Sequence, residues 1–293
     1  MHETILVTGA TGTVGSEAIK ALSTEDVKVR AGVHSIIKGD RLKVFPNVDL
    51  VEIDFSRSES LKVALTGVTR VFLITPLTHN QVEIAKNFID EAKQVGVKQI
   101  VRLSAIGADA EPGIQLGRWH HEIEKHLENS GIPYVILRPT SFMQNFINYA
   151  GASILQENKI YQPLGEGKVS YIDAHNIAAV AKVVLTQNDF KNQVLELTGP
   201  EAISVQEVAA ILSEVTGRTI TYVDVPDQAA RQAMSSMHAP DWMIDAMMEL
   251  NNISKSGYAA TVTDTVEKIT GQRGRTFKEF AQENAHFFIP EHL

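Results

Sequence analysis

Cysteine is absent from the 293 residues of the chain. Its absence excludes disulfide bonds, thiolate nucleophiles and cysteine metal sites, and it fits a reducing compartment, so we expect a cytoplasmic protein. A basic excess is also lacking, because 27 Lys and Arg against 35 Asp and Glu leave a net charge of −8. A mildly acidic chain is poorly suited to a phosphate backbone, so we expect no nucleic-acid partner.

Long hydrophobic runs are lacking as well. No apolar stretch approaches about 20 residues, the length that crosses a bilayer, so we expect no membrane association. The amino-terminal segment does not follow the basic-then-apolar pattern of a signal peptide. Internal repeats and low-complexity segments are also absent, which favours an ordinary globular protein.

What the chain does contain is a hydrophobic fraction of 44%, ample for a sizeable core. Strand patterns alternate with helical apolar spacing through the first half. The strand patterns cover residues 4–8, 27–33, 48–53, 70–75, 99–104 and 134–139. This alternation predicts an α/β fold, a Rossmann-type doubly wound parallel sheet with helices on both faces.

The alternation weakens after residue 140, where helical patterns predominate. We therefore predict a dinucleotide-binding core of residues 1–140, with returning segments from 160–200. Residues 141–158 and 201–293 are predicted to form a smaller, mostly helical substrate-side cap. In a doubly wound sheet, ligands bind at the carboxyl ends of the strands, so the cap is expected to lie over those ends.

The turn "TGATGTVG" follows the first strand pattern and precedes the helical "VGSEAIKALS". Gly9 permits a tight turn, Gly12 permits close approach of a ligand, and Gly15 lets the helix pack on the strand. Backbone N–H groups at the helix start attract a pyrophosphate. A lone glycine pattern is weak evidence, but the strand–turn–helix context favours dinucleotide binding by the turn, including Thr11, Thr13 and Val14.

The glycine spacing resembles that of the short-chain dehydrogenase superfamily. The segments "SGIPYVILRPTSFMQN", "PLGEGKVSYIDAHNIA" and "LTGPEAISVQEVAAILSEVTGR" resemble the NmrA-like family of its atypical branch, over nearly the whole chain. This resemblance implies an NAD(P)H-dependent oxidoreductase similar to the quinone reductases and triphenylmethane-dye reductases of that family. It also implies that Asp54 and Phe55 border the adenine, that Thr75 and Pro76 border the inner ribose, and that Pro139 lies beside the cofactor.

The corner after the second strand favours NADP(H) over NAD(H). NAD-binding proteins usually place a carboxylate there for the ribose 2′-OH, whereas this chain has His34 and Ser35. Lys38 and Arg41 add positive charge that tolerates a 2′-phosphate. Family members that resemble this chain often carry arginine at the position of His34.

Neither residue of the catalytic Tyr-x-x-x-Lys pair of short-chain dehydrogenases is present. Counting back from "SGIPY" places Leu116 at the tyrosine position and His120 at the lysine position. His120 and Glu124 lie one helical turn apart, and the carboxylate is expected to favour the imidazolium. His120 is predicted to bind the nicotinamide ribose, orient the substrate or supply a proton; stabilisation of the helix alone is the alternative. Ser104, at the end of the fifth strand, is predicted to donate a hydrogen bond there.

A zinc site is not expected, because the spacing in "HHEIEKH" does not match H-E-x-x-H. On the substrate side, Phe142, Met143, Asn145, Phe146 and Trp242 are predicted to line a cleft for a flat aromatic or quinone-like molecule. Two functions fit: hydride transfer from NAD(P)H to a quinone, dye or enone, or a non-catalytic NAD(P)-binding redox sensor. The protein is expected to be a monomer or homodimer.

Overall fold

The computed structural model describes residues 3–290, which divide into two compact units. Unit 1 runs to Pro139 and includes Ala174–Leu197, and unit 2 consists of Thr140–Asp173 and the chain from Thr198 onward. The first break falls next to the predicted boundary at residue 140. The returning segment starts at Ala174 instead of 160, because residues 160–173 form strands and loops of unit 2.

Unit 1 is built on a seven-stranded sheet with the order β3-β2-β1-β4-β5-β6-β9. Every pairing in this sheet is parallel, as expected for strands that are connected through helices. The strands are β1 Thr4–Val7, β2 Lys28–Val33, β3 Val48–Glu52, β4 Arg70–Leu73, β5 Gln99–Leu103, β6 Tyr134–Pro139 and β9 Gln193–Leu197. The order confirms the predicted doubly wound α/β fold and reverses direction between β1 and β4, where ligands bind in such sheets.

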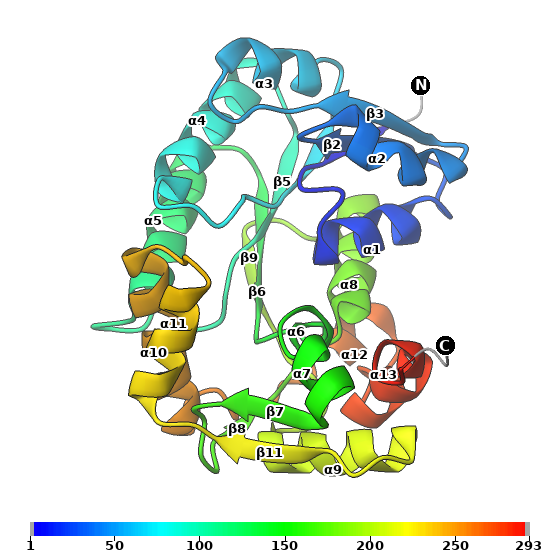
Figure 1. Ribbon diagram of the computed structural model, residues 1–293. Coiled ribbons are helices and arrows are strands. Elements are labelled where there is room, and N and C mark those ends of the chain that lie inside the picture. The colour runs from blue at the N-terminus through cyan, green and yellow to red at the C-terminus, as the bar shows by residue number, and fades with distance from the viewer. Residues whose placement is uncertain (1–2, 291–293) are drawn as a thin grey trace. The chain divides into compact units, whose positions relative to one another are not determined.

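Helices cover both faces of this sheet, with α3, α4 and α5 along one face and α1 and α8 along the other (Figure 1). The helical elements of unit 1 are α1 Thr13–Leu22, α2 Ile36–Gly39, η1 Asp40–Val44, α3 Ser58–Leu65, α4 Gln81–Gln94, α5 Gln115–Ser130 and α8 Ala174–Thr186. The sequence predicted the longer helices but not the short α2 and η1, which lie in the segment after β2.

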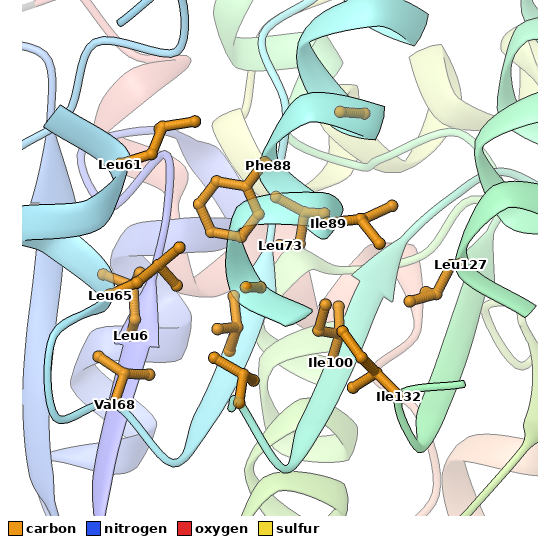
Figure 2. Close-up of a cluster of buried hydrophobic side chains, with 14 of the residues drawn as sticks. Leu6, Leu61, Leu65, Val68, Leu73, Phe88, Ile89, Ile100, Leu127 and Ile132 are labelled. Atoms are coloured by element: carbon orange, nitrogen blue, oxygen red, sulfur yellow. The ribbon is translucent and has the colours of Figure 1, made fainter. Parts of the chain in front are cut away.

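A buried apolar cluster joins the sheet to the α3–α5 layer. Phe88 lies at its centre with no exposed surface, and Leu6, Leu73 and Ile100 approach it from the sheet (Figure 2). Replacing Phe88 by alanine would cost about 3–5 kcal/mol, since a cavity would remain in a packed core. The cluster fixes α5 against β5, and α5 carries several of the predicted site residues.

Unit 2 has its own core and two small sheets, β10 with β8 and β11 with β7. Its strands are β7 Lys159–Gln162, β8 Lys168–Val169, β10 Ile203–Ser204 and β11 Thr221–Asp224. Its helical elements are α6 Asn145–Asn148, α7 Gly151–Glu157, α9 Val205–Thr216, α10 Asp227–Ser236, α11 Asp241–Lys255, α12 Thr265–Thr270, α13 Phe277–Glu283 and η2 Ala285–Phe287. The cap segment predicted over residues 141–158 thus contains two short helices, α6 and α7. None of the helices within residues 3–290 combines the length and apolar character needed to cross a membrane.

Candidate functional site

The glycine turn joins β1 to α1. Gly9 adopts a left-handed φ of +59°, and the backbone N–H of Gly12 donates to its carbonyl at 2.9 Å. A Cβ built on Gly15 would lie 2.1 Å from the carbonyl oxygen of Gly9, which no rotamer could relieve. On Gly12 it would lie 3.2 Å from the same oxygen. The turn therefore needs glycine at Gly9 and Gly15, and it exposes Gly12.

The start of α1 has the properties of an anion site. Gly12 is the N-cap residue and has no side chain to cap the helix, so the start of α1 lacks the usual side-chain cap. Thr13 begins the helix, and Val14 is buried at 3% exposure. Thr8 ties the turn to β4, because its Oγ1 donates to the carbonyl of Ile74 at 2.8 Å and accepts from its N–H. A pyrophosphate fits this glycine cradle, from which side chains are excluded.

The segment after β2 places cationic groups near the turn. His34 and Lys38 are exposed, and Ser35 is half-buried. The Arg41 guanidinium reaches back and donates to the carbonyl of Thr11 at 2.9 Å. The sequence indicated Arg41 only as an added positive charge. Its contact with Thr11, 30 residues away in the chain, is visible only in the folded structure.

The segments after β3 and β4 carry the residues that the family resemblance assigned to the adenine and to the inner ribose of the cofactor. Asp54 is half-buried, and its Oδ1 accepts from the N–H and the hydroxyl of Ser56, which lowers the pKa of the carboxyl. The Phe55 ring packs against Phe88, with centroids 5.7 Å apart. Thr75 follows β4 and is half-buried; Pro76 beside it is exposed. The contacts of these four residues with the cofactor stay predictions.

A buried polar network joins β5, β6 and α5. The Arg138 guanidinium binds Glu124 through two hydrogen bonds of 3.0 and 2.6 Å and pairs with Asp109 at 2.7 Å. Ser104 donates its hydroxyl proton to Glu124 at 2.5 Å. The hydrogen bonds to Glu124, and then that to Asp109, raise the pKa of Arg138, so the guanidinium stays charged. The carbonyl of Pro139, at the end of β6, accepts from the N–H of Ile106 at 3.0 Å. This hydrogen bond ties the end of β6 to the segment that follows β5.

The network changes the roles predicted for two residues. Glu124 is 1% exposed, and its hydrogen-bond partners among residues 3–290 are Ser104 and Arg138, not His120. The predicted His120–Glu124 pair is therefore absent, because the longer reach of Arg138 from the neighbouring strand captures the carboxylate. Since the Ser104 proton is committed to Glu124, its oxygen retains only acceptor capacity toward a ligand.

His120 is half-buried and faces a cation instead of a carboxylate. Its Nδ1 lies 3.5 Å from Nη2 of Arg102. Burial, with the charge of Arg102 second, lowers the pKa of His120 to about 3. The expected imidazolium is thus wrong for this environment: the ring is neutral at physiological pH.

Arg102, like Arg138 and Asp109, was not singled out by the sequence. It is 1% exposed in β5, and its Nη2 donates to Oγ1 of Thr75 at 3.2 Å. Burial lowers its pKa to about 10, an effect that Glu124 partly offsets, so it stays charged at neutral pH. The available signal was an arginine within the apolar run "QIVRLS", where a strand buried on both faces should be apolar.

The residues predicted to contact substrate lie in unit 2. Met143 and Phe146 are 0% and 1% exposed and belong to its hydrophobic core, where Phe146 makes an edge contact with Tyr171 at 5.1 Å. Packing fully accounts for these two side chains, contrary to the expectation that they line a cleft. Phe142, Asn145 and Trp242 are half-buried, so part of each remains accessible.

Comparison with known proteins agrees with this geometry. The sequence profile of the NmrA-like family matches residues 1–281. The chain is 42% identical over 284 residues to NAD(P)H azoreductase of Xenophilus azovorans, covering 97% of this chain and 99% of the relative. It is similar to Escherichia coli quinone oxidoreductase QOR2 in its NADPH complex, with a TM-score of 0.85, 27% identity, and coverage of 96% and 99% of the two chains.

Proposed function

The chain belongs to the NmrA-like family, and on that premise we propose that it is an NAD(P)H-dependent reductase that passes hydride to a small electron-poor aromatic acceptor, such as an azo dye or a quinone. The observation that carries the proposal is the glycine cradle at the end of β1, in a chain 42% identical to an NAD(P)H azoreductase. A bound nicotinamide supplies the hydride. The chain then has to bind, orient and exclude water.

The groups that hold the cofactor come from separate strand ends. The uncapped start of α1 attracts the pyrophosphate, and Gly12 allows its close approach. Asp54 and Phe55 border the adenosine, and Thr75 and Pro76 border the inner ribose in the proposed arrangement. Each of these residues follows a strand of the same parallel sheet, which is why one ligand can meet them all.

We place NADP(H) before NAD(H) because no carboxylate immediately follows β2. His34 and Ser35 occupy that corner, and Arg41 is held beside the phosphate turn through Thr11. Arg41→Ser should weaken NADPH binding about tenfold, the loss of one charge-assisted contact, and leave NADH binding unchanged. Fluorescence titration with both cofactors measures this. Lys43→Ser is the control, since Lys43 lies on the same exposed segment but pairs with Asp40.

A second substitution reverses the preference. His34→Asp would place an acceptor for the ribose 2′-OH at the end of β2 and would repel a 2′-phosphate. The ratio of NADPH to NADH affinity should therefore fall. Equal or tighter binding of NADH by the unaltered protein would contradict the assignment of NADP(H).

The absence of a tyrosine acid fits an acceptor that needs no proton from the protein. Leu116 and His120 stand where short-chain dehydrogenases keep tyrosine and lysine. An azo or quinone acceptor can take its proton from water after the hydride arrives. The chain's contribution is then positioning, to which Phe142, Asn145 and Trp242 of unit 2 are proposed to add contacts with an aromatic substrate.

Oxidation of NADPH against a panel of azo dyes, quinones and enones tests the activity directly. Turnover with at least one electron-poor acceptor, and none with simple alcohols or sugars, is the expected result. Tight NADPH binding without turnover across the panel would instead support a redox sensor that binds the dinucleotide and regulates a partner.

A further inference from the structure

Arg102 lies buried in unit 1, and no carboxylate within residues 3–290 pairs with it. Its Nε has no hydrogen-bond partner within residues 3–290, and the nearby Glu124 is already bound by Ser104 and Arg138. A buried cation without an ion-pair partner costs stability and is seldom kept for packing alone. The contacts that Arg102 does make therefore indicate its role.

Those contacts are with Thr75 and His120. Arg102 lies two residues after Ile100, so its side chain leaves β5 on the face that α5 covers. Its Nη2 donates to Thr75 Oγ1 at 3.2 Å and lies 3.5 Å from Nδ1 of His120. A guanidinium can only donate hydrogen bonds. The nitrogen that faces it must be the one without a proton, which leaves the proton of the neutral ring on Nε2.

The other charges around α5 do not oppose this arrangement. Glu124, on the same helix, spends both carboxylate oxygens on Ser104 and Arg138. On the helix α4, which packs against α5, Lys86 pairs with Glu122, Asp90 contacts the ring of His126 at 2.8 Å, and Glu91 pairs with Lys62 of α3. Protonation of His120 would place a second cation against Arg102, while the nearby carboxylate of Glu124 is already bound by Ser104 and Arg138.

We propose that Arg102 is a positioning residue that holds His120 in its neutral tautomer with the proton on Nε2. His120 then donates a hydrogen bond from Nε2 to the ligand bound at this end of the sheet and transfers no proton during turnover. The tautomer is inferred from the contact of Nδ1 with Arg102, whereas its use in reduction rests on the function proposed above. Thr75 holds the guanidinium in place. The position of the loop after β4 is thereby linked to the tautomer of the His120 imidazole.

Nitrogen-15 NMR of the histidine rings, recorded on the protein with neither cofactor nor substrate added, tests the tautomer directly. His120→Asn identifies the His120 signals by their loss. The expected result is a neutral ring protonated on Nε2 from pH 8 down to at least pH 5. A ring of the unaltered protein that titrates near the ordinary value of about 6.5, or that carries its proton on Nδ1, would overturn the proposal.

Arg102→Met and Arg70→Met form a matched pair of variants. Both remove a buried arginine, but Arg70 lies at the amino end of β4 and binds Gln99 and the carbonyl of Gln187. Arg102→Met should yield a tautomer mixture and an apparent pKa of His120 that moves up toward 6.5. Arg70→Met should lower stability and leave the His120 signals unchanged. An unchanged tautomer in Arg102→Met would refute the role of Arg102.

Kinetics separate positioning from packing. Arg102→Met should lower kcat about tenfold with NADPH affinity nearly unchanged, the equivalent of one misdirected hydrogen bond. Arg102→Lys, which keeps a cation and a donor, should restore part of the rate. If kcat falls equally in Arg102→Met and Arg102→Lys, in proportion to the loss of folded protein, then Arg102 serves only the stability of the fold. If the NMR result holds but no acceptor is reduced, the proposed function fails and the tautomer assignment stands.

Discussion

The two ends of the candidate site in unit 1 are formed by different groups, one by the backbone and the other by side chains. At the end of β1, three glycines within seven residues, from Gly9 to Gly15, form a cradle of backbone groups. Near the ends of β5 and β6, side chains from residues far apart in the chain form a buried network around Glu124 and Arg102. The shape of the backbone-built end depends on the absence of Cβ atoms. The side-chain-built end depends on the pairing of buried charged groups.

This difference dictates how each end can fail. The glycine cradle fails when a methyl group is added at Gly15, because the new Cβ would meet the carbonyl oxygen of Gly9 and this backbone cannot move aside. The network around Glu124 tolerates small changes of shape but not the loss of a partner, because an unpaired buried charge is expensive. Substitutions at the two ends should therefore separate ligand binding from stability.

The largest effect is expected at the backbone-built end. Gly15→Ala would place a methyl group 2.1 Å from the carbonyl oxygen of Gly9 and force the turn open. NADPH affinity should fall about a thousandfold, equivalent to ~4 kcal/mol, since the helix start could no longer approach the phosphates. Fluorescence titration measures this loss. Gly151→Ala, at a helix start where the new Cβ meets only a carbonyl 3.8 Å away, is the control and should bind normally.

The next effect concerns the side-chain-built end. Glu124→Ala would leave Arg138 buried beside only the exposed Asp109, and it should lower the free energy of unfolding by roughly 3 kcal/mol. Denaturant unfolding measures this change. Glu128→Ala, which breaks a more exposed pair with Lys125 on the same helix, should cost at most about 1 kcal/mol. Equal losses in the two variants would contradict the importance of the buried pair.

A smaller effect is expected at His120. His120→Ala should reduce the single-turnover rate of NADPH oxidation about tenfold at saturating acceptor, the cost of one hydrogen bond to the ligand. The neutral ring does not transfer a proton. The pH profile of the rate should therefore be free of a His120-dependent step near pH 6.5, and the profiles of the unaltered protein and of His120→Ala should have the same shape. A rate that is unchanged in His120→Ala would remove the residue from the site.

The last effect is on stability and appears only at acidic pH. The folded-state pKa of His120 is lowered to about 3 by burial and by Arg102, while the unfolded chain has an ordinary value near 6.5. Between these values the unfolded state binds the extra proton, so the His120 contribution is complete above pH 6.5 and is lost as the pH falls toward 3. Thermal unfolding of His120→Asn should therefore show a shallower decline over this window. His79→Asn, at an exposed histidine of the same unit, is the control for loss of a ring.

Local patterns predicted the parts of the site that are contiguous in sequence. The strand before Gly9, the turn itself and the helix after Gly12 need no distant partner to be recognised, because glycine spacing and apolar periodicity report local geometry. The same reasoning failed for the His120–Glu124 pair. Helical spacing shows that two side chains can meet, but it cannot reveal a stronger competitor, here Arg138 on β6.

By itself the sequence determined the doubly wound α/β fold, the position of the glycine turn and the missing Tyr-x-x-x-Lys pair, because each depends on periodicity or on spacing along one segment. Tertiary structure decided the ionisation and the partners of the buried polar groups. Arg102 meets Thr75 and His120 only once β5 lies between β4 and β6 and α5 covers its face. The electrostatic free energy of a buried charge depends on distances between distant segments, and such distances exist only after folding.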